Sequence, residues 1–363
     1  MGRKFQTDIE LETKPDFLEC MDRVYAWYEN EIIDRVPVRF SAHNAEYNVI
    51  DKTNRWSSMK EKWFDTQYQV ERFEKGIEGK VFLGETFPVY WPNLGPNVYP
   101  CMLGCDVEFG DVTTWAKHTL NEVSEYDKIY FSMENEYFRK LEEMTKYAIS
   151  RCKGKYMVGY TDIHSGGDAA DALRGTQELL MDIYDEPEET KKLIEKCGEA
   201  FGTVFEHFNK MLKDAGQPSV TWINIPSFDT FHIPGTDLGA MLSPEMYNEY
   251  ILPEVIKEVK YAKHNVFHVD GKGVARHLDS LLEIDEICGY QWVQGMGADE
   301  PIMQWVPMIK KIQDRKKGIV VDLKPAELDS FMDAVKPNGI YLCIDTSVEE
   351  EQRAILKKLE KWK

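Results

Sequence analysis

The chain has 363 residues, 43% of them hydrophobic, which provides enough apolar surface for a large buried core. It carries 63 acidic and 44 basic side chains, a formal net charge of −19, and no long Lys or Arg run, which argues against a surface that follows nucleic-acid phosphates. The seven cysteines form no CxxC pair, the first residues are polar and no stretch is apolar enough for a membrane span, so we expect a cytoplasmic protein without disulfides or a zinc knuckle.

Helix-like and strand-like patterns alternate along the chain. A first helix is expected over residues 12–32, and the alternating Val36, Val38 and Phe40 predict the first strand. The aromatic segment 63–96 that follows contains Gly and Pro residues, which predict loops around a short strand near Val81. The remaining helix and strand pairs are expected at 133–151 and 156–162, 186–213 and 219–224, 244–262 and 265–271, 274–283 and 286–295, 301–316 and 318–324, and 325–335 and 339–345.

Capping residues mark several helix starts. Pro187 in a first turn, and Pro244 directly after Ser243, are typical of helix N-termini. For the last helix, Ser347 followed three residues later by Glu350 predicts a capping box, and the lysines near its other end suit the negative end of the helix dipole.

The order of these elements predicts the fold class. Strands separated by helices are joined by right-handed crossovers into a parallel sheet, and about eight such units close a (β/α)8 barrel. A doubly wound open sheet is the competing fold, but neither a GxGxxG motif nor a P-loop follows the first strand. Because the chain has no internal repeat or low-complexity linker, we expect one domain over residues 1–363, with a helical N-terminal extension at 1–35, the barrel at 36–363 and a long insertion after the first strand.

Active sites of such barrels lie at the C-terminal ends of the strands. In the stretch VFHVDGKG, His268 and Asp270 are two residues apart, so they share one face of a strand. Asp162 and His164 have the same spacing after an earlier strand, and the two pairs are candidate catalytic groups that would face each other across the mouth. The alternative for each residue is a loop cap or a buried hydrogen bond, and for His164 a cap on the loop SGGD.

Other polar and aromatic residues at expected strand ends are candidate binding groups. The candidate substrate contacts are Trp91, Tyr160, Trp222, Asn224, Gln291 and Asp322, and the further strand-end residues are Ser41, His43, Asn44, Glu85, Trp292, Gln294, Cys343 and Asp345. The tryptophans could wall a pocket for a flat or methylated ligand, although in a large barrel most of them pack in the core. The long apolar segment 90–104 predicts a lid, a partner-docking surface or a homodimer contact.

Five stretches in order carry a family resemblance. They are DRVPVRF near the start, YTDIHSGGDAADALRGTQELLMDIYDEP in the middle, FHVDGKGVARHLDSLLEI, YQWVQG, and the closing GIYLCIDTSVEEEQRAIL. Together they resemble the uroporphyrinogen decarboxylase superfamily of (β/α)8 barrels over nearly the whole chain. That superfamily holds porphyrinogen decarboxylases and methyltransferases that work with corrinoid proteins, so the resemblance implies one of these two activities.

The segment after the first strand favours the second activity. Decarboxylases of this superfamily carry an arginine-rich stretch there to hold a substrate with many carboxylates, whereas the stretch RFSAHNAEY contains Arg39 alone. The resemblance therefore implies a methyltransferase that moves a methyl group between a small methylated or methoxylated substrate and the corrinoid of a partner protein.

The same branch implies a metal site. Its members bind zinc through a His-x-Cys pair at one strand end and a cysteine near a later one. The matching positions here are His268, Asp270 in place of the first cysteine, and Cys343, a donor set that zinc accepts. The alternatives are that Cys343 is a buried apolar residue and that His268 is a metal-free general acid beside Asp270. Two other functions stay open for the chain: a decarboxylase or lyase acting on a smaller acid, and a non-catalytic barrel.

Overall fold

The computed structural model describes residues 5, 7–40 and 55–362. Its strands are β1 (Val38–Phe40), β2 (Val89–Tyr90), β3 (Asp106–Phe109), β4 (Thr114–Lys117), β5 (Met157–Val158), β6 (Phe231–His232), β7 (His264–Asp270), β8 (Ile287–Val293), β9 (Gly318–Leu323) and β10 (Ile340–Ile344). Six of them form a sheet in the order β1-β10-β9-β8-β7-β6, in which every neighbouring pair is parallel. The expected class, an α/β chain with a parallel sheet, is confirmed.

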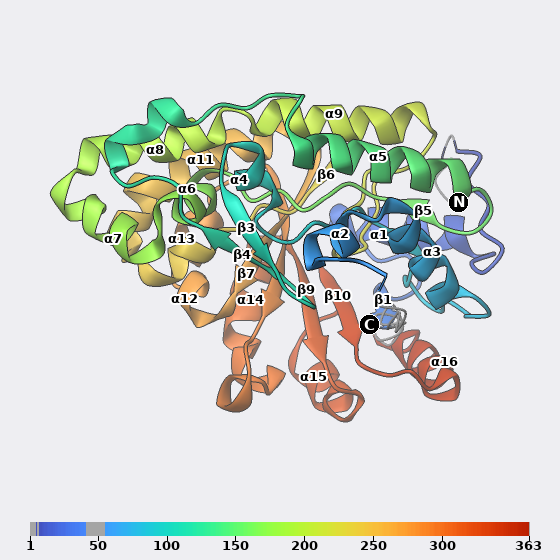
Figure 1. The fold of residues 1–363 in the computed structure, drawn as a ribbon. Coiled ribbons are helices and arrows are strands. Elements are labelled where there is room, and N and C mark those ends of the chain that lie inside the picture. The colour runs from blue at the N-terminus through green and yellow to red at the C-terminus, as the bar shows by residue number, and fades with distance from the viewer. Residues whose placement is uncertain (1–4, 6, 41–54, 363) are drawn as a thin grey trace.

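Helices connect and cover these strands. They are α1 (Phe17–Tyr28), α2 (Met59–Phe64), α3 (Thr66–Ile77), α4 (Val98–Met102), α5 (Glu136–Arg151), α6 (Gly166–Arg174), α7 (Thr176–Asp185), α8 (Pro187–Gly198), α9 (Phe201–Asp214), α10 (Pro244–Met246), α11 (Leu252–Glu258), α12 (Gly271–Ala275), α13 (Leu278–Leu281), α14 (Val306–Asp314), α15 (Leu328–Ala334) and α16 (Glu349–Leu359). Figure 1 shows the curled sheet between α8 and α9 on one side and α14, α15 and α16 on the other. No helix in the described part of the chain is long and apolar enough to cross a bilayer.

A smaller parallel sheet consists of β2 and β5. Hydrogen bonds connect it toward both edge strands of the larger sheet, β1 and β6. On one side the Glu85 N–H, just before β2, donates to the Val38 carbonyl of β1 at 2.7 Å. On the other side the Tyr160 N–H, just after β5, donates to the Val220 carbonyl at 2.9 Å, and the Ser219 hydroxyl accepts from the Phe231 N–H of β6 at 2.9 Å. Residues 219–224, expected as a strand, contribute only an isolated bridge between Ser219 and Ser227.

The first third of the chain differs most from the prediction. Residues expected to be loops form α2 and α3, and the first short strand after them is β2, not a strand near Val81, which is 56% exposed. The helices have ordinary start signals, because the Ser58 hydroxyl accepts from the Glu61 N–H and the Asp65 carboxylate accepts from the Tyr68 N–H. A hairpin of β3 and β4 was also not predicted.

The segment 90–104 is neither a lid nor an exposed docking surface. It folds around α4, all five residues of which are buried, and the hydroxyl of Tyr99 donates to the Cys197 carbonyl of α8 at 2.7 Å. Its apolar side chains join the main core, so the prediction from its length and composition was wrong.

Two long helices are interrupted and one cap differs. The helix expected over 186–213 is divided into α8 and α9, and the one over 244–262 into α10, a π-helical turn (Tyr247–Ile251) and α11. Ser243 caps α10 as predicted, by accepting from the Met246 N–H at 3.2 Å. The capping box at Ser347 is wrong: α16 begins at Glu349, and the hydroxyl of Thr346 accepts from the Val348 N–H instead.

A buried ion pair joins the two sheets at their seam. Glu85 is fully buried, and its carboxylate accepts from both terminal nitrogens of Arg35, at 2.7 and 2.9 Å, and from the Val38 N–H at 2.7 Å. Because the Glu85 N–H also donates to the Val38 carbonyl, this one residue pairs with β1 through both its backbone and its side chain. Glu85 was expected at a strand end, but it precedes β2 and is a structural residue.

We predict that Glu85→Leu lowers the free energy of unfolding by about 3–5 kcal/mol, because it leaves the Arg35 guanidinium buried without its partner. Urea denaturation measures the change. The matched control is Glu349→Gln, which breaks a surface pair with Arg353 and should cost less than about 1 kcal/mol. A loss as small as that of the control would show that the seam does not depend on Glu85.

Stability should also depend on the protonation of His264. Its ring stacks on Tyr28 with centroids 4.0 Å apart, Nδ1 pairs with the Ser227 hydroxyl at 2.9 Å, and burial lowers the pKa of His264 to about 4. The unfolded chain therefore binds a proton that the folded chain rejects between about pH 6.5 and 4, so unfolding becomes easier as the pH falls through this window.

We predict that acidification from pH 7.5 to 5 removes about 2 kcal/mol of stability through this residue, and that His264→Gln removes that part of the pH dependence. Urea denaturation of both proteins at the two pH values provides the measurement. Equal pH dependence in the two proteins would contradict the assignment.

Candidate functional site

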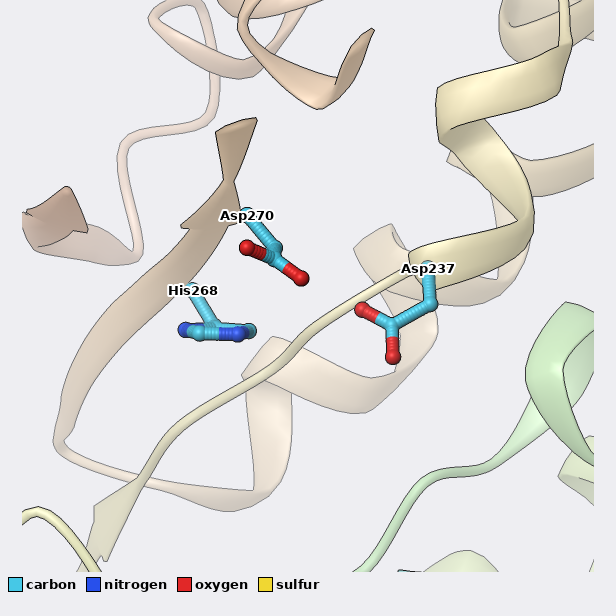
Figure 2. Close-up of side chains that lie close together, drawn as sticks. All are labelled: Asp237, His268 and Asp270. Carbon is cyan, nitrogen blue, oxygen red and sulfur yellow. The ribbon is translucent and has the colours of Figure 1, made fainter. Parts of the chain in front are cut away.

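The parallel direction of the larger sheet brings the C-terminal ends of its strands to one edge. There β7 ends with His268 and Asp270 on one face, as their spacing predicts, and a short 3-10 helix, η3 (Asp237–Met241), follows β6. The side chains of Asp237, His268 and Asp270 converge so that one ligand atom from each lies within 4.8 Å of the others. Figure 2 shows the Asp237 carboxylate pointing from its own segment toward the two β7 residues.

His268 is oriented by a residue of the next strand. Its Nδ1 lies 2.6 Å from Oε1 of Gln291 on β8, and because an amide oxygen only accepts, Nδ1 is the donor in this hydrogen bond and Nε2 is not engaged by it. The half-buried Trp222 meets the imidazole edge to face, with ring centroids 5.2 Å apart. Gln291, expected to contact substrate, thus orients His268. Among the described contacts, His268 has no hydrogen bond to Asp270.

The second pair lies beside the first. Asp162 Oδ2 lies 2.8 Å from His164 Nε2, and Asp168 Oδ2 lies 3.5 Å from His164 Nδ1, so both ring nitrogens face carboxylates. Although burial opposes the charged form, these two carboxylates raise the pKa of His164 well above its ordinary value. Burial likewise opposes ionisation of Asp162, but the imidazole of His164 outweighs it and lowers the pKa of that carboxyl. His164 is therefore a fixed cation between two anions.

Gly235 explains how the two histidines come together. A Cβ at this position would lie 3.5 Å from both His164 Cε1 and His268 Cβ, so the Gly235 backbone runs close beside both side chains. It also forms an isolated parallel bridge with His268. A larger side chain than alanine at position 235 would push the two pairs apart.

Asp237 and Asp168 complete the site, and the sequence interpretation missed both. Partial burial, followed by the negative charge of Asp168, raises the pKa of the Asp237 carboxyl. Asp168 lies in the first turn of α6, and its two oxygens accept from the Asp237 and Leu238 N–H groups, each at 3.0 Å. Asp168 is the acidic residue that follows SGG in the sequence, and that stretch was assigned to a loop.

Cys343 has other partners than the cluster. Its thiol on β10 lies 2.6 Å from the Arg39 Nε of β1 and beside Asp322, and burial raises the pKa of the Cys343 thiol to about 12. Burial also raises the pKa of Asp322. Cys343, Asp322, Gln294 and Asp345 line a cavity of about 150 Å³ at the ends of β8, β9 and β10. No ligand atom of Cys343 belongs to the group of three that converges in the described residues.

The other candidate contacts have varied surroundings. Tyr160 is 1% exposed and its hydroxyl donates to the Phe231 carbonyl at 2.8 Å, which ties β5 to β6. Asn224 is buried with a positive φ of 54°, and Trp91 is half-buried. Trp292 is fully buried against Trp305, with centroids 4.7 Å apart. Ser41, His43 and Asn44 lie outside the described residues.

The donor set of the Asp237, His268 and Asp270 cluster fits a divalent cation. Two carboxylates and an imidazole whose Nε2 is not engaged by Gln291 are donors that zinc and other first-row metals accept. Three protein ligands would leave a coordination position open for substrate. The hydrogen bond from His268 to Gln291 is the outer contact by which metal-binding histidines are commonly oriented.

Comparisons with known proteins extend the description of the fold. Neither the models of protein families nor the curated proteins include a match to this sequence. Among solved structures, the chain is similar to a methyltransferase from Methanosarcina mazei, with a TM-score of 0.61, 12% sequence identity, and coverage of 94% of this chain and 98% of that one. At this identity the likeness is one of fold, and it extends over nearly the whole chain.

We predict that the purified chain binds about one Zn²⁺, and that Asp237→Asn and His268→Ala abolish this binding because each removes a metal ligand. Cys343→Ala should retain the metal, because that thiol contacts Arg39. Elemental analysis after equilibration with Zn²⁺ and removal of the excess measures the content. Metal lost in Cys343→Ala but kept in Asp237→Asn would instead favour the His268, Asp270 and Cys343 set.

Proposed function

We propose that the chain is a methyltransferase that moves a methyl group between a small methylated substrate and the corrinoid of a partner protein. The observation that carries the proposal is the convergence of Asp237, His268 and Asp270 at the C-terminal edge of a parallel sheet. This is the edge at which α/β barrels bind and transform their substrates. The similarity in fold to a methyltransferase over nearly the full length of both chains supports the choice of reaction.

We further propose that the two sheets together form a (β/α)8 barrel that spans a single domain. The hydrogen bonds from Glu85 to Val38 and from Tyr160 to Val220 support this, because they join β2 and β5 to their neighbours on either side. A closed barrel has no free edge strand and directs all its strand ends into one mouth. Both His/Asp pairs and Asp237 would then border the same substrate pocket.

In this mechanism Asp237, His268 and Asp270 hold a divalent cation, zinc in the resembling branch, which supplies Lewis-acid assistance when it is bound. Methyl transfer to cobalt breaks the bond between the methyl carbon and its heteroatom, and the bonding electrons stay with the departing group. The chain must therefore stabilise charge on that group. Gln291 holds the His268 ring through Nδ1, and Trp222 packs edge to face against the imidazole.

The second His/Asp pair has an electrostatic role. Both ring nitrogens of His164 face carboxylates, so its positive charge balances Asp162 and Asp168 in the crowded acidic mouth. A proton held by two carboxylates and a strongly raised pKa makes His164 a poor acid near neutrality. The proton or Lewis acid that meets the departing group is therefore assigned to the Asp237, His268 and Asp270 cluster.

The charge of the mouth disfavours the decarboxylase alternative. Asp237, Asp270, Asp322 and Asp345 gather at the same strand ends, and in the described residues this edge has no cluster of guanidinium groups to hold a substrate with several carboxylates. Two exposed methionines at this edge, Met241 at the end of η3 and Met296 after β8, instead offer apolar contacts to a partner that brings the corrinoid.

The test is methyl transfer with cob(I)alamin as acceptor and a panel of methyl ethers and methylated amines as donors. Methylation of the cobalt is followed by the change in its visible absorbance. We predict that His268→Ala and Asp237→Asn each lower the rate by about 100-fold or more, the range expected when acid or metal assistance is lost.

The control is Asp329→Asn, which breaks only a surface ion pair with Lys358 and should keep the wild-type rate. Loss of carbon dioxide from a small acid, without methylation of cobalt by any donor, would replace the proposal by the decarboxylase alternative. Wild-type rates in both site variants would remove the cluster from the mechanism.

A further inference from the structure

We propose that Asp168 is a positioning residue that sets the metal affinity of the Asp237, His268 and Asp270 cluster. The inference rests on the metal site of the proposed function and adds to it a residue that does not itself belong to the converging ligands. Asp168 acts through its neighbours: it holds the backbone that carries Asp237, and it faces the imidazole of His164.

The first step concerns the N-terminus of η3. The first N–H groups of a helix have no partner within the helix, and the residue before η3, Thr236, provides no side-chain cap. Asp168 supplies the missing acceptor from another element, because its Oδ2 accepts from the Asp237 N–H and its Oδ1 from the Leu238 N–H, each at 3.0 Å. The backbone position of the ligand Asp237 is thus fixed by two charge-assisted hydrogen bonds.

The second step shows that this support is local. The far end of η3 has its own contacts: His277 Nε2 pairs with the Gly239 carbonyl at 2.8 Å, and the His277 ring stacks on Tyr247 with centroids 4.0 Å apart. Without Asp168 these contacts would still hold the helix on the protein. Only its first turn, which presents the Asp237 carboxylate, would lose its anchor.

The third step concerns the opposite side of the cluster. Asp168 Oδ2 lies 3.5 Å from His164 Nδ1, and the other nitrogen of that ring is held by Asp162 at 2.8 Å. Gly235 lies beside both histidines, because a Cβ on it would meet His164 Cε1 and His268 Cβ at 3.5 Å, and its backbone forms a parallel bridge with His268. One carboxylate, 11% exposed, thereby restrains the metal ligand Asp237 directly and also holds His164, which lies beside the Gly235 segment that bridges to His268.

Groups that hold metal ligands in place typically contribute 10- to 100-fold to metal affinity. We therefore expect Asp168→Ala and Asp168→Asn to weaken Zn²⁺ binding by about 10-fold or more. The asparagine variant is informative because it keeps the size of the side chain but replaces one acceptor oxygen with an NH2 group, which cannot accept from both N–H groups.

The experiment measures Zn²⁺ affinity of the full chain by competition with a chromophoric chelator, together with the melting temperature before and after Zn²⁺ addition. The matched control is Asp171→Asn, which removes a carboxylate from the same helix, α6, whose side-chain partner is Thr176. Its affinity should stay within about 2-fold of wild type, while both Asp168 variants show weaker binding and a smaller rise in melting temperature with Zn²⁺.

Two outcomes would overturn the inference. One is an unchanged Zn²⁺ affinity in both Asp168 variants, with only the metal-free melting temperature lowered, which would reduce Asp168 to a structural cap. The other is a wild-type chain that binds no Zn²⁺. Failure of the proposed function gives a different result. If the chain methylates no cobalt but the Asp168 variants bind Zn²⁺ more weakly, the proposed reaction is rejected and the role of Asp168 stands.

Discussion

Parallel pairing of the strands is the constraint on which the candidate site depends. Because every pair in the larger sheet is parallel, the C-terminal ends of β7 through β10 share one edge and the N-terminal ends share the other. The N-terminal side carries the structural polar groups: Glu85 is neutralised by Arg35, and the buried ammonium group of Lys14 donates to the Gly84 carbonyl at 2.6 Å. Each of these charges has its partners, so their burial ties segments together at tolerable cost. At the opposite edge, carboxylates lie close together and only some of them have a positively charged partner. Such destabilising charge arrangements are typical of functional sites.

The balance of charge at this edge explains why His164 lies between carboxylates. Asp162 and Asp168 would repel each other and Asp237 if nothing stood between them, and His164 occupies that position with both ring nitrogens directed at carboxylates. Arg39 has a comparable place behind the cavity, where its guanidinium faces Cys343 and Asp322. In the described part of the chain no basic side chain bonds to Asp237 or Asp270, and with His268 they form the donor set on which the proposed divalent cation rests.

The sequence predicts those features that depend on local patterns. Periodicity located β7 through β10, and the two-residue spacing placed His268 and Asp270 on one face of β7, since both properties belong to a single strand. Asp237 and Asp168 could not be found in this way, because they come from a short 3-10 helix and a helix start that only tertiary packing brings together. Composition misled where it replaced pattern. The Gly and Pro content of 63–96 suggested loops, although the caps at Ser58 and Asp65 were readable, and the apolar segment 90–104 is buried as core.

The surroundings of Cys343 connect the departure from the resembling family's zinc ligands with the position of Asp237. A guanidinium 2.6 Å from the sulfur occupies the space that a metal ion would need, and its charge would repel one. Under the proposed metal site, the donor set keeps the histidine, has aspartate at 270 and takes its third donor, Asp237, from η3 on the other side of β7. Replacing soft thiolates with carboxylates lowers the preference for zinc over harder cations, since carboxylate oxygens also suit manganese and magnesium. If a metal binds as proposed, Asp237 and Asp270 together take the place of the family's thiolates, and the donor set lies on the β7 and η3 side of the mouth, away from Cys343.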